Sequence, residues 1–258
     1  MSNAAAAHAD LEKNELNAWR FRRHFTRAGR FKSGPNPARE TIAAGSRVLV
    51  LDIAKFKATP KVTDPFEYVV VPDFITQDAQ AAAFADFPDI QDGGLYPPES
   101  INVRGGFKKV MDELMGDAFR EAVSEKFDID LSRLPAMFTA RGHLREKDGQ
   151  IHNDSKTKVI TVLLYFNAKP WPHEGGKLRM LRGPDDMEDF AEEVAPEGGL
   201  LIVFKRSDHS WHGHPSFVGP RKAIQLNWVT DQGVVFRETG KHNLTATIKK
   251  LKRAVGVS

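Results

Sequence analysis

Short apolar runs that indicate strands dominate the chain from residue 136 onward. The longest, 159–166, is rich in β-branched and aromatic residues, as is typical of a buried strand. The same criteria predict strands at 136–140, 177–182, 200–205 and 223–229, and a short acidic surface helix or turn at 185–193. Strands at this spacing, separated by turn residues, predict an antiparallel sandwich or barrel.

Before residue 136 the pattern is mixed. Apolar runs at 48–51 and 68–71 predict two strands, and helical spacing predicts a helix at 78–87, capped by Thr76. A second helical region, 107–127, is divided at Gly116. Six of its apolar residues share one face: Val110, Leu114, Phe119, Ala122, Val123 and Phe127. We therefore expect an α+β fold with a mainly β core, in which helices from the N-terminal part cover the sheet.

Both ends of the chain are basic and are expected to lie outside the core. Residues 1–45 carry a basic run with interleaved aromatic residues, followed by glycines and prolines, and predict a partly disordered extension rather than a nucleic-acid contact. Residues 233–258 predict a basic helix whose apolar face packs on the body rather than on a membrane or nucleic acid. One domain is expected between them, at 46–232, with a cover at 46–135 and a core at 136–232.

Composition narrows the chemistry that is possible. The 258 residues include no cysteine, which excludes disulfides, points to a cytoplasmic setting and leaves histidine and carboxylate as metal ligands. No run is long and apolar enough for a membrane span, and residues 1–32 lack the apolar stretch of a secretory signal. The formal net charge is only +3 and is concentrated at the two ends.

A candidate metal site begins with His152 and Asp154, just before the long strand. Residues two apart on a strand face the same side, so the pair can present an imidazole and a carboxylate to one cavity. A third ligand would come from His209, His212 or His214. Such a set leaves one face of the metal open and suits Fe(II) that binds a cosubstrate and O₂. The alternative is a short motif that arises by chance.

A candidate anion site follows. Arg221 lies nine residues after His212, and its guanidinium could bind the far carboxylate of a 2-oxo acid that chelates the metal. Lys222 is the alternative, on the opposite side of the strand. On the 159–166 strand, Thr161 and Tyr165 share one face and could line the same pocket. The alternative is that the tyrosine lies at the rim of the sheet and that the threonine hydroxyl is hydrogen-bonded within the core.

As a set, these residues resemble the 2-oxoglutarate- and Fe(II)-dependent dioxygenases of the prolyl 4-hydroxylase type. The resemblance covers about 136–230 and rests on 152–154, 161–167, Trp171, 174–179, 198–204, His212 and 219–221. It implies a double-stranded β-helix, or jelly roll, with iron held by His152, Asp154 and His212. It also implies that Arg221 binds 2-oxoglutarate, with help from Tyr165. Thr161, on the same face of its strand as Tyr165, is a further candidate for binding the cosubstrate.

The resemblance further implies hydroxylation of a C–H bond by O₂, coupled to decarboxylation of 2-oxoglutarate to succinate and CO₂, often with ascorbate. The substrate would be a peptide or a small molecule. Many prolyl hydroxylases have a tyrosine on the strand before the His-x-Asp pair, where this chain has Arg141 and His143. These two are candidates for substrate contact, or else surface charges. Gln225 and Asn227 lie on the same side of their strand as Arg221. The branch that repairs nucleic acid typically has a second arginine at the position of Asn227, so nucleic acid is disfavoured as the substrate.

Two other classes of protein are compatible with this pattern. One is a cupin-type metal enzyme that binds iron but no 2-oxo acid. The other is a non-catalytic jelly-roll binding module on a degraded site. The dioxygenase should change its absorption when 2-oxoglutarate is added, whereas the cupin-type enzyme should not. The dioxygenase should also form succinate, whereas the binding module should not.

Overall fold

The computed structural model describes residues 49–237. The expected extension 1–45 lies outside them, and so does the expected C-terminal helix, except for its first residues, which are helical over 232–237. No helix within 49–237 is long and apolar enough to cross a membrane.

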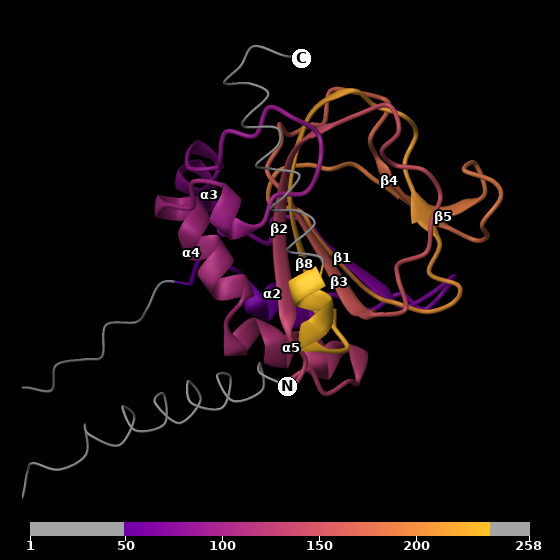
Figure 1. Ribbon diagram of the computed structural model, residues 1–258, viewed down its shortest axis with the longest axis horizontal. Coiled ribbons are helices and arrows are strands. Elements are labelled where there is room, and N and C mark those ends of the chain that lie inside the picture. Colours follow the sequence, from indigo (N-terminus) through magenta and orange to yellow (C-terminus); the bar gives the residue numbers. More distant parts are fainter. Residues whose placement is uncertain (1–48, 238–258) are drawn as a thin grey trace, which may run out of the picture. The chain divides into compact units, whose positions relative to one another are not determined.

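Two antiparallel sheets form the body (Figure 1). The larger has the order β1-β6-β3-β8-β2 and the smaller the order β5-β4-β7. The strands are β1 (Tyr68–Val71), β2 (Ala136–Leu144), β3 (Lys158–Tyr165), β4 (Leu178–Leu181), β5 (Phe190–Val194), β6 (Leu201–Lys205), β7 (His212–Gly213) and β8 (Gly219–Val229). Strands far apart in sequence are neighbours, which confirms the expected jelly-roll core.

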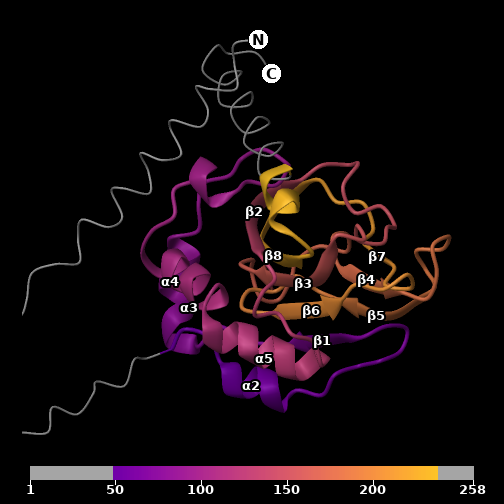
Figure 2. The same cartoon turned by 60° about the horizontal axis from the view of Figure 1, so that its bottom comes forward.

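Helices cover the outer face of the larger sheet (Figure 2). They are α2 (Ile53–Ala58), α3 (Gln77–Ala85), α4 (Gly105–Leu114) and α5 (Asp117–Phe127), with a 3₁₀ turn η1 (Pro98–Ser100). The six apolar residues predicted to share one face of 107–127 are all buried in the cluster beneath these helices. The helical cover expected from the sequence is confirmed.

Strand β3 divides two cores. Ile160, Val162 and Leu164 are fully buried against the helices, and each such side chain contributes roughly 1.5–3 kcal/mol. Tyr165 and Leu163 instead belong to the smaller cluster between the two sheets. The alternation predicted for this strand is therefore confirmed from Ile160 to Tyr165, where it places the hydroxyls of Thr161 and Tyr165 inside the jelly roll. Val159 differs, because it packs on the helical cluster beside an irregularity in the strand.

The prediction of a strand at 48–51 is wrong. Only Leu51 pairs, by a single bridge to Ile75, and the backbone amides of Val50 and Leu51 donate to the Glu113 carboxylate of α4 at 2.9 and 3.0 Å. A side chain distant in sequence thus satisfies donors that a strand would have paired. The chain then enters α2, whose first turn Asp52 caps by accepting from Lys55 N at 2.8 Å.

The prediction of a helix or turn across 185–193 is also wrong at its end, where β5 forms. The cause lies on the partner strand. Arg179 of β4 bonds Glu193 through Nε at 2.7 Å and lies over the Phe190 ring at 4.5 Å. These contacts hold an acidic segment in an extended conformation.

Candidate metal centre and its cavity

The His152–Asp154 segment lies between β2 and β3 and is not part of a strand, contrary to the prediction. His152 makes one isolated bridge, to His212. Asn153 points the other way: its Nδ2 donates to Ser207 O at 2.8 Å and its Oδ1 accepts from Ser210 Oγ at 2.8 Å. These bonds hold the Asn153 side chain against the 207–210 loop, and His152 and Asp154 on either side of it face the same cavity.

The structure brings three candidate ligands together. One donor atom from each of His152, Asp154 and His212 lies within 4.8 Å of the others. His152 Nδ1 lies 2.8 Å from Gln150 O, and His212 Nδ1 lies 2.9 Å from Ser210 O. A carbonyl can only accept, so each Nδ1 carries the proton and each Nε2 keeps its lone pair. Two such nitrogens and a carboxylate fit Fe(II).

The charges of the site also suit a cation. Burial, together with nearby His152, lowers the pKa of His212 to about 4, so this imidazole is neutral at pH 7. Burial acts to raise the pKa of Asp154, but Lys158, His212 and the hydroxyl of Thr161 outweigh it and the pKa is lowered. Lys158 Nζ and Thr161 Oγ1 each lie 2.6 Å from an Asp154 oxygen. The carboxylate is therefore ionised and held in place.

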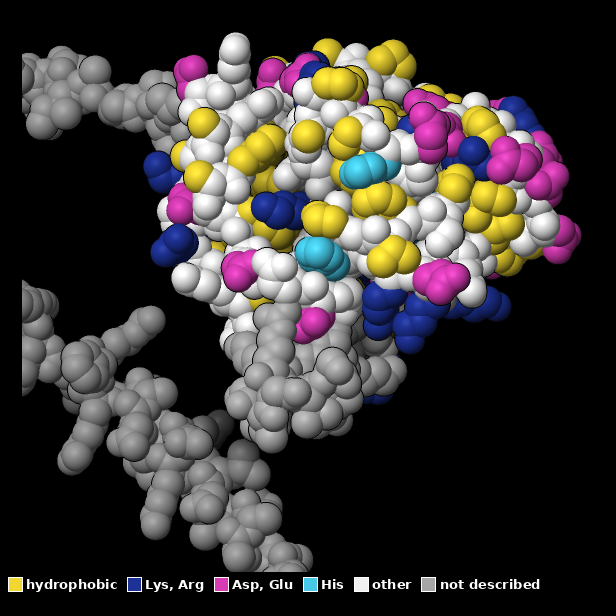
Figure 3. All heavy atoms as spheres, turned by 90° about the horizontal axis from the view of Figure 1, so that it is seen from above, with side chains coloured by type: hydrophobic (Ala, Val, Ile, Leu, Met, Phe, Trp, Pro, Cys, Tyr) yellow, Lys and Arg dark blue, Asp and Glu magenta, His cyan; other side chains and the backbone are white. Residues whose placement is uncertain are grey.

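A cavity of about 510 Å³ opens between the sheets at this site. Its lining includes the three candidate ligands and Arg141, Thr161, Leu163, Phe204, His214, Arg221 and Gln225. On the face seen in Figure 3, hydrophobic, basic and acidic side chains are interspersed, and acidic side chains are frequent on its right-hand side.

Arg221 points into the jelly roll and is 5% exposed. Its Nε donates to Gly176 O at 2.8 Å and its Nη2 to Tyr165 Oη at 3.1 Å. Lys222 points out, with its Nζ 5.5 Å from the centre of the Phe87 ring. The predicted sides of the strand for Arg221 and Lys222 are confirmed.

Thr161 lies at the metal end of the cavity, away from the Arg221–Tyr165 pair. It donates to Asp154 and accepts from Asn227 Nδ2 at 2.7 Å, and Asn227 in turn accepts from Gln225 Nε2 at 3.2 Å. This chain of polar groups on β3 and β8 fixes the candidate carboxylate ligand.

The other two histidines behave differently. His209 is exposed and does not line the cavity. His214 is buried and lines it, with its Nδ1 2.9 Å from Pro215 O, and burial followed by the charge of Arg221 lowers its pKa to about 4. Neither joins the three-residue group formed by the described part of the chain.

Sequence reasoning missed Lys158 and Phe204, which touch the site directly. Lys158 bonds Asp154, and the Phe204 ring lies 4.7 Å from that of His212. Phe204 could have been found, because it alternates with the outward Val203 on a predicted strand. No local signal marked Lys158.

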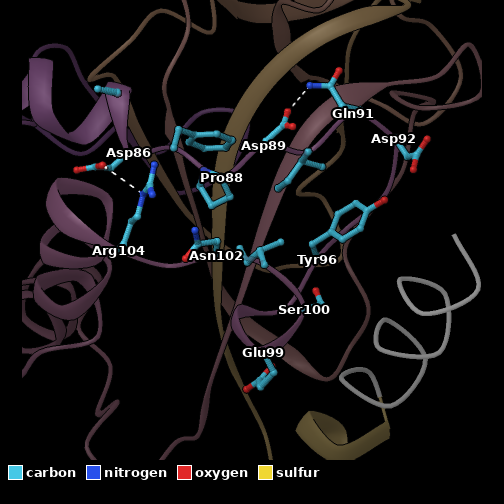
Figure 4. Close-up of a pocket in the computed structure, with 14 residues that line it drawn as sticks. Asp86, Pro88, Asp89, Gln91, Asp92, Tyr96, Glu99, Ser100, Asn102 and Arg104 are labelled. Atoms are coloured by element: carbon cyan, nitrogen blue, oxygen red, sulfur yellow. Dashed lines mark hydrogen bonds and ion pairs between the residues drawn. The ribbon is translucent and has the colours of Figure 1, made fainter. Parts of the chain in front are cut away.

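A second cavity, of about 640 Å³, lies beside the 85–104 segment and shares no lining residue with the first (Figure 4). Its wall carries Asp86, Asp89, Asp92 and Glu99, and no histidine lines it. Arg104 pairs with Asp86 at 3.6 Å, and Gln91 donates to Asp89. The larger hollow is thus acidic and lacks the candidate ligands.

Comparison with known proteins identifies the core. Residues 137–230 match the model of the 2OG-Fe(II) oxygenase superfamily, which spans β2 to β8 and all three candidate ligands. No curated protein matches the chain.

Several solved structures have similar chains. A prolyl-4-hydroxylase of Pseudomonas putida has 19% identity and a TM-score of 0.43, over 69% of this chain and 90% of the other. The viral collagen prolyl hydroxylase of Paramecium Bursaria Chlorella virus-1 has 16% identity and a TM-score of 0.44, over 67% and 94%. An oxidoreductase of the 2OG-Fe(II) oxygenase family from Burkholderia pseudomallei has 13% identity and a TM-score of 0.43, over 69% and 89%.

The superfamily implies Fe(II) as the cofactor, and 2-oxoglutarate and O₂ as co-reactants, at such a site. The recognition made from the sequence is confirmed at the level of the superfamily: residues 137–230 match the model of the 2OG-Fe(II) oxygenases, a superfamily of enzymes.

Proposed function

We propose that this protein is an Fe(II)- and 2-oxoglutarate-dependent dioxygenase that hydroxylates a C–H bond of a small-molecule or peptidyl substrate and releases succinate and CO₂. One observation carries the proposal. The donor atoms of His152, Asp154 and His212 lie within 4.8 Å of one another, in the same cavity as the buried Arg221.

His152, Asp154 and His212 would hold the metal on one face. Bound there, Fe(II) would supply the activation of O₂ that couples oxidation of 2-oxoglutarate to hydroxylation. The chain keeps both imidazoles in the tautomer that can bind a metal, through the carbonyls of Gln150 and Ser210. Little reorganisation is then needed when the metal enters.

Arg221 would bind the distal carboxylate of 2-oxoglutarate. Two of its N–H groups are committed to Gly176 O and Tyr165 Oη, which fixes the plane of the guanidinium and leaves its other donors free for a bidentate contact. Tyr165 accepts from Arg221, so its own proton is available for the same carboxylate. Burial strengthens both contacts, because little water competes for them.

Thr161 would assist indirectly, by holding Asp154 at 2.6 Å. Ascorbate would be the reductant that keeps such iron active. A cytoplasmic setting is in keeping with a chain that lacks cysteine. A nucleic-acid substrate is disfavoured by Asn227, which is buried and bonded to Thr161.

Anaerobic titration of the Fe(II) protein with 2-oxoglutarate tests the proposal. A visible charge-transfer absorption and, in air, succinate formation are expected, and Asp154→Ala should abolish iron retention and both signals. Asp189→Ala, in the exposed acidic loop, is the control and should retain them. Iron binding without the absorption would favour a cupin-type enzyme, and failure to form succinate would favour a binding module.

A further inference from the structure

A second arginine faces the cavity from the neighbouring strand. Arg141 of β2 pairs in register with Ala223 of β8, which is also in register with Tyr165 of β3. All three side chains lie on the inner side of the larger sheet. Because Ala223 is small, Arg141 and the Arg221–Tyr165 pair flank the same space.

The guanidinium of Arg141 has only a weak partner. Its contact among the described residues is a 3.7 Å ion pair with Asp148, and it donates no hydrogen bond there. Asp148 is already bound by Arg145, through the backbone N at 2.9 Å, Nε at 3.2 Å and Nη2 at 2.9 Å. The five N–H donors of Arg141 are thus available to a ligand.

This cation is largely removed from water. Its side chain is 23% exposed, and burial lowers its pKa, an effect that Asp148 opposes and Arg221 reinforces. A buried charge without a close partner is costly, so the site favours a bound anion.

The charges of the cavity point the same way. Its lining has four basic side chains, Arg141, Lys147, Lys158 and Arg221, and two carboxylates, Asp148 and Asp154. Asp154 is neutralised by Lys158 and Asp148 by Arg145. In the proposed reaction, one carboxylate of 2-oxoglutarate goes to the metal and the other to Arg221. Arg141 is then left with only the distant carboxylate of Asp148, which Arg145 already binds.

We propose that Arg141 binds a carboxylate of the primary substrate, and that this substrate is a small carboxylic acid. The inference rests on the proposed function. The cavity of about 510 Å³ lies within the range of roughly 300–1,000 Å³ typical of small-molecule sites. A carboxylate on Arg141 would orient the rest of such a molecule along the row towards the metal ligands.

Equilibrium binding to the protein loaded with Mn(II) and 2-oxoglutarate, which does not turn over, tests this inference. The probes are free L-amino acids and short mono- and dicarboxylic acids, each compared with its primary amide. At least one acid should bind more tightly than its amide. Arg141→Gln should raise the Kd of that acid by about 10- to 100-fold, as expected for a lost charge-assisted hydrogen bond. The Kd of 2-oxoglutarate should stay within about twofold of its wild-type value.

Two further variants control for structure. Arg182→Gln removes an exposed arginine that does not line the cavity, and should keep acid binding. Arg141→Lys should recover part of the acid binding that Arg141→Gln loses. Thermal melting checks that each variant is folded.

Acids that bind no better than amides, or no bound probe at all, would overturn the inference. So would an Arg141→Gln variant that loses 2-oxoglutarate affinity as strongly as Arg221→Gln, because Arg141 would then serve the cosubstrate. Failure of the proposed function itself is separate: the wild-type Fe(II) protein would give no absorption with 2-oxoglutarate.

Discussion

His152 and His212 exchange two backbone hydrogen bonds, each with an N···O distance of 3.0 Å, and their rings lie 4.3 Å apart. Each also places Nδ1 on the carbonyl two residues before it. The two imidazoles are therefore related by local pairing of their own segments rather than by a regular ladder. The site depends on whatever keeps these two segments together.

Asn153 is the side chain that joins the segments. Asn153→Ala removes its bonds to Ser207 and Ser210, so the histidines should be held less firmly, and Fe(II) affinity should fall by about 10- to 100-fold. Competition with a chelator measures this. Ser155→Ala, at an exposed neighbour, should keep wild-type affinity. Equal affinities in all three proteins would show that Asn153 has no such role.

Arg221 and Lys222 offer a matched pair. Arg221→Gln should raise the Kd for 2-oxoglutarate on the order of 100-fold, because one partner of a buried charge pair is lost, while iron binding persists. Lys222→Gln, on the outer side of the same strand, should have no effect. The anaerobic absorption titration reports both. A larger effect from Lys222→Gln would reverse the assignment.

Lys158 competes with a bound cation for Asp154. In Lys158→Met, Mn(II) should bind several-fold more tightly, because a positive charge 2.6 Å from the ligand carboxylate is removed. The metal-free variant should unfold at lower urea concentration, because the buried carboxylate loses its counter-ion. Lys156→Met, at an exposed position, is the control. Weaker Mn(II) binding would contradict this electrostatic account.

The metal-free protein should lose stability in acid. The folded-state pKa values of His212 and His214 are lowered to about 4 from 6.5, so the unfolded chain binds these protons at higher pH. The free energy of unfolding should therefore fall as pH decreases from about 6.5 towards 4. Urea midpoints across this range measure it. His214→Gln should flatten the decline and exposed His209→Gln should not; identical slopes would be contrary to expectation.

The parts of the fold that depend on side-chain period could be predicted from sequence. Alternation along β3 placed Thr161 and Tyr165 on one face, and both lie inside the jelly roll. The same rule separated Arg221 from Lys222. It works because burial of one face fixes which residues point inward, wherever the strand lies in the sheet.

The rest depended on partners distant in sequence. The 48–51 run has a strand's composition, but Glu113 takes the amides of its last two residues. The acidic β5 is extended because Arg179 pairs with it. His152 and Asp154 share a side because Asn153 is tied to another loop, and not because they form a strand. A single-chain pattern carries no trace of such partners.

The single methyl group of Ala223 separates Arg141 from Tyr165 across three adjacent strands. Residue 223 therefore lies between the arginine proposed to bind the cosubstrate and the arginine proposed to bind the molecule to be modified. Enlarging it by even two carbons would narrow the passage between them without touching any charged group. The length of acid that the enzyme accepts would then be set by a residue with no chemistry of its own.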